Sequence, residues 1–131
     1  MSKKMSIVVS HGTLDAAYVA LNIALTGRAL DAEVNMFFTF EGVNIIRKGA
    51  ADTLPGSPTQ PHIRQGLEKS GTPPVSELLA AAVDSGINIV GCQMTLDVMG
   101  ITRDTLIDGI ETGGATTFLA SAFESDVNLH V

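Results

Sequence analysis

Short apolar runs rich in β-branched residues alternate along this chain with segments of helical spacing, and this alternation constrains the fold most. In the first helical segment, Leu14, Tyr18, Leu21 and Leu25 recur at intervals of three and four residues. The expected strands are residues 7–9, 34–40, 87–91, 110–111 and 127–131. The expected helices are residues 14–26, 43–47, 75–85, 103–107 and 115–123. Repeated strand–helix units predict an α/β fold with a mainly parallel sheet covered by helices on both faces.

Residues 48–74 interrupt this pattern. They contain all five prolines and four of the glycines, and they show no strong period apart from one possible helical turn at residues 62–69. A long irregular segment in a compact domain is usually a lid, a binding loop or a partner contact. We therefore expect it to form part of a subunit interface or a cover over Cys92.

Composition limits the class of protein and its partners. The 131 residues predict one domain, 1–131. The net charge is −6 and the eight Lys and Arg form no basic run, which argues against nucleic-acid binding. Only 17% of residues are charged, below the usual quarter, so both faces of some elements are expected to be covered by helices, by partner subunits of a homo-oligomer, or by both.

The expected location is the cytoplasm. The single cysteine cannot form an intramolecular disulfide and suits a reducing compartment. The apolar stretch near the start ends after three residues, too short for a signal peptide, and no run approaches the ~20 residues of a membrane span. We expect no membrane insertion.

Cys92 is the candidate nucleophile because it directly follows the expected strand 87–91. Ligands of open α/β sheets bind at the carboxyl ends of the strands. A helix beginning soon after Cys92 would stabilise a thiolate, the nucleophilic form of cysteine. The alternative is that Cys92 is inert packing, as most buried free cysteines are. Asp97 favours this alternative, because a nearby carboxylate would raise the pKa of the thiol.

Other strand ends supply candidate partners for the sulfur. The anion- or substrate-binding candidates are His11, Gly12, Thr13, Phe40, Gln93, Met94 and Thr95. His11 could assist the thiol, although a structural or exposed histidine is the simpler interpretation. Met94 and Met99 could frame a sulfur-friendly pocket, but core filling is the favoured interpretation. His62 and His130 show no ligand spacing with Cys92, so no metal is expected, and no nucleotide or other cofactor motif is present.

Segments 10–15, 37–48, 91–101 and 106–119 together resemble the DsrE/DsrF/DsrH-like family, in particular the second type of DsrE proteins. The resemblance covers nearly the whole chain. It implies a three-layer α/β/α sandwich with a sheet of about five strands, a tendency to form homo-oligomers, and a role in sulfur trafficking. In that role a cysteine accepts sulfane sulfur as a persulfide and passes it to an acceptor protein. Cys92 matches the family cysteine within the sequence Gly-Cys-Gln-Met.

Three functional hypotheses follow. The leading one is a cytoplasmic persulfide carrier or sulfurtransferase-like protein that exchanges sulfur with donor and acceptor proteins. The single Cys92 suits this role, since a self-contained disulfide reductase would need a second cysteine. The alternatives are a non-catalytic oligomeric binding or assembly subunit and a small-ligand-binding module of the same fold.

Overall fold

A five-stranded sheet forms the centre of the computed structural model, which describes residues 2–131. The strands run in the order β4-β3-β2-β1-β5, and every neighbouring pair is parallel. They are β1 (Lys4–Val9), β2 (Glu33–Phe38), β3 (Asn88–Cys92), β4 (Glu111–Gly113) and β5 (Val127–His130). The α/β class and the parallel sheet predicted from the sequence are confirmed.

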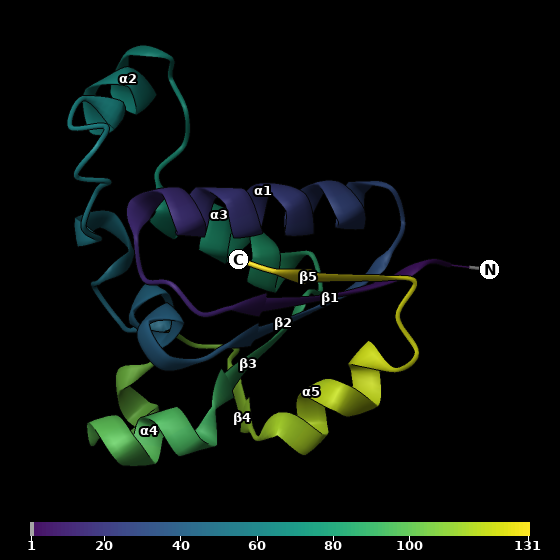
Figure 1. The fold of residues 1–131 in the computed structure, drawn as a ribbon. Coiled ribbons are helices and arrows are strands. Elements are labelled where there is room, and N and C mark those ends of the chain that lie inside the picture. Colours follow the sequence, from purple (N-terminus) through teal and green to yellow (C-terminus); the bar gives the residue numbers. More distant parts are fainter. Residues whose placement is uncertain (1) are drawn as a thin grey trace.

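Helices cover both faces of the sheet and complete three layers (Figure 1). The α-helices are α1 (Leu14–Ala29), α2 (Ile63–Lys69), α3 (Val75–Asp84), α4 (Gln93–Met99) and α5 (Ala115–Ala122). Three 3-10 helices are η1 (Phe40–Ile46), η2 (Ala51–Thr53) and η3 (Arg103–Thr105). Helices α1 and α3 lie on one face, and α4 and α5 lie on the other. None of the helices within residues 2–131 combines the length and apolar character needed to cross a membrane.

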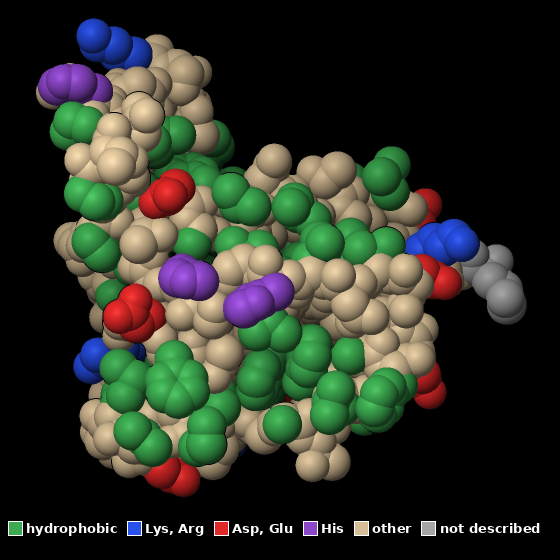
Figure 2. Space-filling view, viewed as in Figure 1, with side chains coloured by type: hydrophobic (Ala, Val, Ile, Leu, Met, Phe, Trp, Pro, Cys, Tyr) green, Lys and Arg blue, Asp and Glu red, His purple; other side chains and the backbone are tan. Residues whose placement is uncertain are grey.

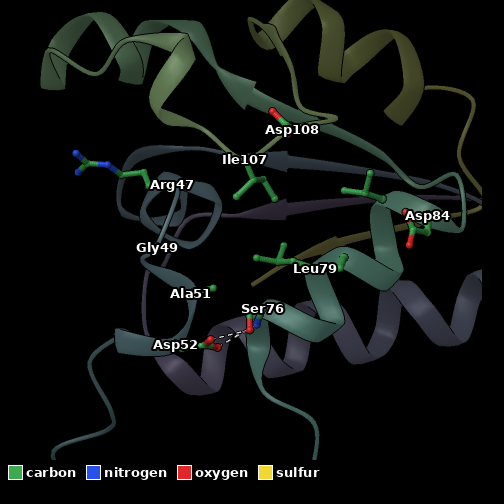
Figure 3. Close-up of a pocket in the computed structure, with 11 residues that line it drawn as sticks. Arg47, Gly49, Ala51, Asp52, Ser76, Leu79, Asp84, Ile107 and Asp108 are labelled. Carbon is green, nitrogen blue, oxygen red and sulfur yellow. Dashed lines mark hydrogen bonds between the residues drawn. The ribbon is translucent and has the colours of Figure 1, made fainter.

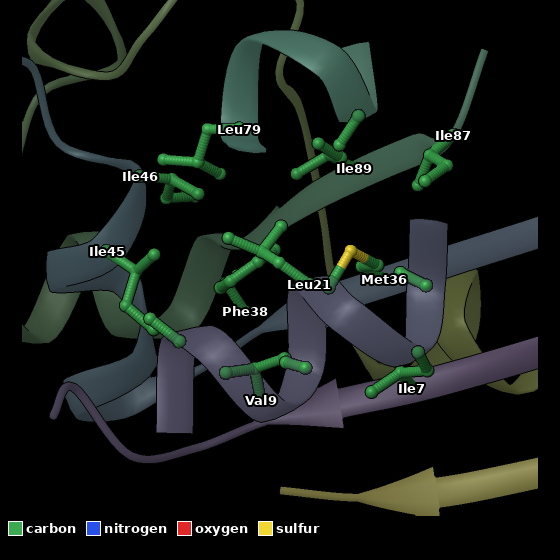
Figure 4. Packing of buried hydrophobic residues seen from close by; sticks show 14 of the residues in the cluster. Ile7, Val9, Leu21, Met36, Phe38, Ile45, Ile46, Leu79, Ile87 and Ile89 are labelled. Atoms are coloured by element: carbon green, nitrogen blue, oxygen red, sulfur yellow. The ribbon is translucent and has the colours of Figure 1, made fainter. Parts of the chain in front are cut away.

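The main core lies between the sheet and the α1/α3 layer. Side chains alternate between the two faces along each strand, so every second strand residue points into this core. The core includes Ile7, Val9, Met36, Phe38 and Ile89 from the strands and Leu21 and Leu79 from the helices (Figure 4). The opposite face has a much smaller cluster, formed by Phe37, Val90 and Cys92 with Val8 and Phe118 packed against it. The sheet is therefore well covered on one face and thinly covered on the other.

Helix α1 begins where the sequence indicates, with Thr13 as the capping residue directly before it. The Thr13 hydroxyl accepts a hydrogen bond from the Ala16 N–H at 3.3 Å, and Asp15 lies in the first turn. Both features stabilise the positive end of a helix. The cap fixes the course of the chain where it leaves β1, at the carboxyl edge of the sheet.

Two expected elements are shorter in the structure for a clear physical reason. The expected helix 103–107 is only the single turn of η3, because Ile107 N–H donates to the Ile46 carbonyl at 2.9 Å and Leu106 forms a bridge with Arg47. The expected strand 34–40 ends at Phe38, since the chain turns into η1 at Phe40.

The segment 48–74 packs against the α1/α3 layer. Leu14 N–H donates to the Pro55 carbonyl at 2.9 Å, and the Tyr18 hydroxyl donates to the Pro73 carbonyl at 2.8 Å. Helix α2 projects from the body on this side (Figure 1). Cys92 belongs to the cluster on the opposite face, so the expectation that this segment covers Cys92 within one chain is wrong.

Candidate functional site

Cys92 ends β3 and immediately precedes α4, at the carboxyl edge of the sheet. Its side chain packs with Phe37 and Val90 on the thinly covered face, and only 4% of the residue is exposed. A helix that was not among the expected ones, α4, begins at the next residue. The thiol therefore lies at the edge where parallel sheets bind ligands, within the smaller of the two apolar clusters.

Polar groups around Cys92 lower the pKa of its thiol. Burial raises the pKa of the thiol, but bonds from the Thr95 hydroxyl and N–H, the Thr39 hydroxyl and the Met94 N–H together lower it below its ordinary value. Donors directed at a thiolate favour the charged form and so increase the nucleophilic fraction. The expectation that Asp97 leaves the pKa raised is wrong. Its carboxylate accepts a hydrogen bond from Gln93 Nε2 at 2.9 Å.

Thr95 connects the sulfur to the start of η1. Its side chain is 0% exposed, and its hydroxyl oxygen accepts the Phe40 N–H at 2.9 Å. It also lies 3.3 Å from the Thr39 hydroxyl oxygen. Because the Phe40 N–H occupies a lone pair of the Thr95 oxygen, the hydroxyl proton is free to point at Cys92. Successive hydrogen bonds of this kind polarise and strengthen one another.

Phe40 adopts an unusual backbone conformation at this point. Its φ is +48°, in the left-handed region that bulky residues rarely occupy. Its side chain is half-exposed while its N–H points inward to Thr95. Strained residues of this kind cluster at functional sites, where the surrounding structure holds them. Phe40, a sequence candidate, thus contributes a backbone N–H to the network and an apolar side chain to the surface.

The structure separates the remaining candidates into two groups. Met94 and Thr95 lie against the sulfur, whereas the Gln93 side chain is exposed and bonds Asp97. Thr39 was not chosen as a binding candidate, although the sequence places it with Phe40 at the second strand end expected to converge on Cys92. Its position at the end of the strand next to β3 was the available signal, because neighbouring strand ends converge at one edge.

His11, Gly12 and Thr13 do not bond the sulfur. The Ser10 hydroxyl oxygen lies 3.3 Å from His11 Nδ1 and 2.7 Å from Nε2 of His130, and both histidines are exposed. Gly12 is buried where an added Cβ would meet the Glu41 carbonyl, and Thr13 caps α1. The residues after β1 therefore position the backbone at this edge. The groups that contact the thiol follow the ends of β2 and β3 instead.

Exposed apolar side chains gather on the face that holds Cys92. Of the nine large apolar side chains exposed within residues 2–131, six lie at Phe40, on α4, on α5 or at the residue after α5, which marks this face as unpartnered. Figure 2 shows this apolar surface below a pair of histidines, with acidic side chains at its margin. Met94 and Met99 belong to it, so the interpretation that they fill the core is wrong.

A separate cavity of about 330 Å³ lies between α3 and the chain around η2 (Figure 3). Its floor is apolar, with Leu79 and Ile107, and its rim carries Arg47, Asp84 and Asp108. It contains no cysteine or histidine, and it lies on the α3 side of the sheet rather than beside Cys92. Within the described part of the chain, no three His, Cys, Asp or Glu side chains gather as a metal site would require.

Comparison with known proteins adds independent information. The family described as "DsrE/DsrF/DrsH-like family" matches residues 1–63 and 56–130. The sulfur carrier protein DsrE2 of Allochromatium vinosum is 29% identical over an alignment of 156 positions, which covers 98% of each chain. The protein YrkE of Bacillus subtilis is 29% identical over an alignment of 157 positions, which covers 99% of this chain and 98% of that protein.

Two solved structures have the same fold. The ychN protein from E. coli superimposes with a TM-score of 0.70 at 17% identity, covering 100% of both chains. Protein MTH1491 from Methanobacterium thermoautotrophicum gives 0.69 at 12% identity, covering 99% of this chain and 100% of that one. At these identities the likeness extends to the fold alone, and it supports the three-layer architecture.

Proposed function

The chain belongs to the DsrE/DsrF/DrsH-like family, and from this membership and the surroundings of its thiol we propose that it carries sulfane sulfur as a persulfide on Cys92. The observation that carries the proposal is the set of donors from Thr95, Thr39 and Met94 that lowers the pKa of Cys92 against the effect of burial. The likeness to a protein named as a sulfur carrier supports the same role.

The transfer needs no external oxidant or reductant. In loading, the Cys92 thiolate attacks the outer sulfur of a donor persulfide, a new S–S bond forms, and the donor leaves as a thiolate. In delivery, an acceptor thiolate attacks the outer sulfur held on Cys92, the Cys92 S–S bond breaks, and Cys92 leaves as a thiolate. A lowered leaving-group pKa accelerates this second step. The donors around Cys92 thus serve both directions of exchange.

Mass spectrometry tests the proposal directly. The reduced protein is incubated with a persulfidated peptide, and Cys92 is expected to gain ~32 Da, the mass of one exchanged sulfur. A thiol acceptor added afterwards removes this mass. The Cys92→Ser variant, whose hydroxyl cannot form a persulfide, is the control and stays unmodified. Wild-type protein that remains unmodified under conditions that load a known carrier contradicts sulfur carriage.

The proposed setting is the cytoplasm, where a reducing environment keeps a single thiol free. The proposed assembly is a homo-oligomer that buries two exposed apolar side chains, Leu119 on α5 and Phe123 directly after it. Sedimentation of the wild type against Phe123→Ser tests the assembly. A wild-type protein that sediments as a monomer at micromolar concentration contradicts it.

The cavity beside α3 supports a second candidate function, the binding of a small molecule. Its apolar floor and mixed-charge rim suit a small amphipathic ligand. A ligand that binds only the folded protein raises Tm. A thermal-shift screen of small metabolites tests this candidate, with Ala80→Phe, which fills the cavity, as the variant that removes any shift. A screen without a shift contradicts it.

A further inference from the structure

The peptide bond between Thr39 and Phe40 lies in an unfavourable backbone geometry. Phe40 has a φ of +48°, in the left-handed region, whereas Thr39 is extended, with φ −132° and ψ 151°. A bulky residue in the left-handed region costs free energy, so the surrounding structure must hold it there. Two hydrogen bonds do so. The Phe40 N–H donates to the Thr95 hydroxyl oxygen at 2.9 Å, and the Gly42 N–H donates to the Thr39 carbonyl at 2.9 Å.

The chain on both sides of this peptide is fixed to the end of β1. The Thr39 N–H donates to the Val9 carbonyl at 3.0 Å. Gly42 packs so closely against the same carbonyl that an added Cβ would collide with it. Turning the peptide over between these fixed neighbours would give Phe40 a negative φ and relieve its strain. The peptide therefore has two arrangements, one strained and hydrogen-bonded to Thr95, the other relaxed and without that bond.

The strength of the bond from Phe40 to Thr95 depends on the charge of the Cys92 sulfur. The Thr95 hydroxyl donates to that sulfur while its oxygen accepts the Phe40 N–H. A hydrogen bond to a charged partner is roughly twice as strong as a neutral one, and bonds in series polarise one another. A thiolate therefore makes the Thr95 oxygen a stronger acceptor, and a neutral sulfur makes it a weaker one. Water screens this effect little, because Thr95 is fully buried.

We propose that Phe40 is a positioning residue that couples the charge of the Cys92 sulfur to the surface of the protein. A thiolate holds the strained peptide in place through Thr95. Once the Cys92 sulfur is the neutral inner atom of a persulfide, the population shifts toward the relaxed peptide. The Phe40 side chain is 50% exposed, so the unloaded and loaded proteins present different surfaces to donor and acceptor proteins. This use of the coupling rests on the proposed sulfur carriage, whereas the coupling itself needs only the thiol.

Hydrogen exchange of the Phe40 N–H, followed by NMR at pH about 8.5, tests the coupling. At this pH, the ordinary pKa of cysteine, the lowered pKa of Cys92 makes most of it thiolate. Methyl methanethiosulfonate then caps the sulfur: the thiolate attacks, a new S–S bond forms, methanesulfinate leaves, and Sγ becomes neutral as in a persulfide. The Phe40 N–H is expected to exchange about two- to fivefold faster in the capped protein, because its acceptor is weaker. The Thr39 N–H, bonded to Val9, is the internal reference and keeps its rate.

Three variants separate the effect of charge from those of bulk and strain. Cys92→Ser places a neutral hydroxyl at the site without added bulk, and it is expected to show the faster Phe40 exchange without any reagent. Phe40→Asn and Phe40→Leu both remove the aromatic ring, but asparagine tolerates a left-handed φ and leucine does not. The leucine variant is therefore expected to keep the response to capping. The asparagine variant loses most of it, because its peptide gains little by turning over.

The outcomes separate this coupling from sulfur carriage. Equal Phe40 exchange rates in the free, capped and Cys92→Ser proteins overturn the coupling and leave sulfur carriage intact. Faster exchange at Phe40 and Thr39 alike shows general loosening of the site and also overturns it. Equal responses of Phe40→Asn and Phe40→Leu overturn the role of the left-handed φ. A Phe40 response to capping in a protein that no persulfidated peptide loads supports the coupling and overturns sulfur carriage.

Discussion

Replacing Thr95 by valine removes the hydroxyl that links Cys92 to Phe40 while nearly preserving the volume of a fully buried side chain. In the native protein this hydroxyl accepts the Phe40 N–H at 2.9 Å and donates to the sulfur. Thr95→Val therefore has two expected effects. It leaves one N–H without its partner, and it raises the pKa of Cys92.

The stability effect follows from the lost hydrogen bond. A buried N–H left without a partner costs about 1–3 kcal/mol, and the Phe40 bond is only partly buried, so we expect about 1–2 kcal/mol. With about 2.1 cal/mol/K of unfolding entropy per residue, the 131 residues convert this loss into a fall in Tm of about 4–7 °C. Thermal unfolding followed by circular dichroism measures it.

The effect on the thiol is measured by the rate of alkylation with iodoacetamide across pH, because only the thiolate reacts. For Thr95→Val the midpoint of this profile is expected to lie at higher pH than in the wild type. Thr95→Ser is the matched control. It loses a buried methyl group and about 1 kcal/mol of stability, but it keeps the hydroxyl and the wild-type midpoint. Coincident midpoints for the valine and serine variants would refute the role of the hydroxyl.

Three further predictions rest on separate observations. The folded-state pKa of Cys92 is lowered, so the thiolate stabilises the fold at pH values above the unfolded pKa of about 8.5. This contribution to stability is lost as the pH falls through the folded-state pKa. Urea unfolding at pH 7 and pH 9 should therefore show the free energy of unfolding rising with pH in the wild type relative to Cys92→Ser. Gly42→Ala places a methyl group against the last carbonyl of β1 and should cost about 1–3 kcal/mol or more, whereas Gly56→Ala, where the methyl group meets open space, should leave Tm within about 2 °C. Asp52 accepts hydrogen bonds from the N–H and hydroxyl of Ser76 at 3.1 and 2.7 Å. Asp52→Ala should therefore lower the free energy of unfolding by about 0.5–2 kcal/mol, as the loss of a helix cap does. Unchanged denaturation midpoints would contradict this.

Much of the architecture could be predicted because it depends on local pattern. The apolar runs that become β1 and β2 bury alternate residues, and the start of α1 follows from the cap at Thr13. The same reasoning placed Cys92 at the end of a strand. Local pattern failed at η3, where a contact between distant segments, Ile107 with Ile46, replaced the expected helix.

The network around the sulfur could not be predicted in full, since it depends on a conformation that the residue type disfavours. Nothing in the sequence indicates that Phe40 adopts a left-handed φ and turns its N–H toward Thr95. Exposure of Met94 and Met99 was equally hidden, because apolar residues are normally assigned to the core. Their exposure follows from α4 lying at the edge of the thinly covered face.

The unequal covering of the two faces has a consequence for how this chain combines stability with exchange. The large cluster under α1 and α3 contains most of the buried apolar residues, while the cluster at Cys92 contains only three. A partner that rearranges Met94 or Phe40 to reach the sulfur therefore disturbs few core contacts. Motions that expose a reactive group require the least free energy where buried contacts are few. Since the Thr95 side chain that links Phe40 to the sulfur is itself fully buried, such motion changes access to the thiol while its hydroxyl donor stays in place.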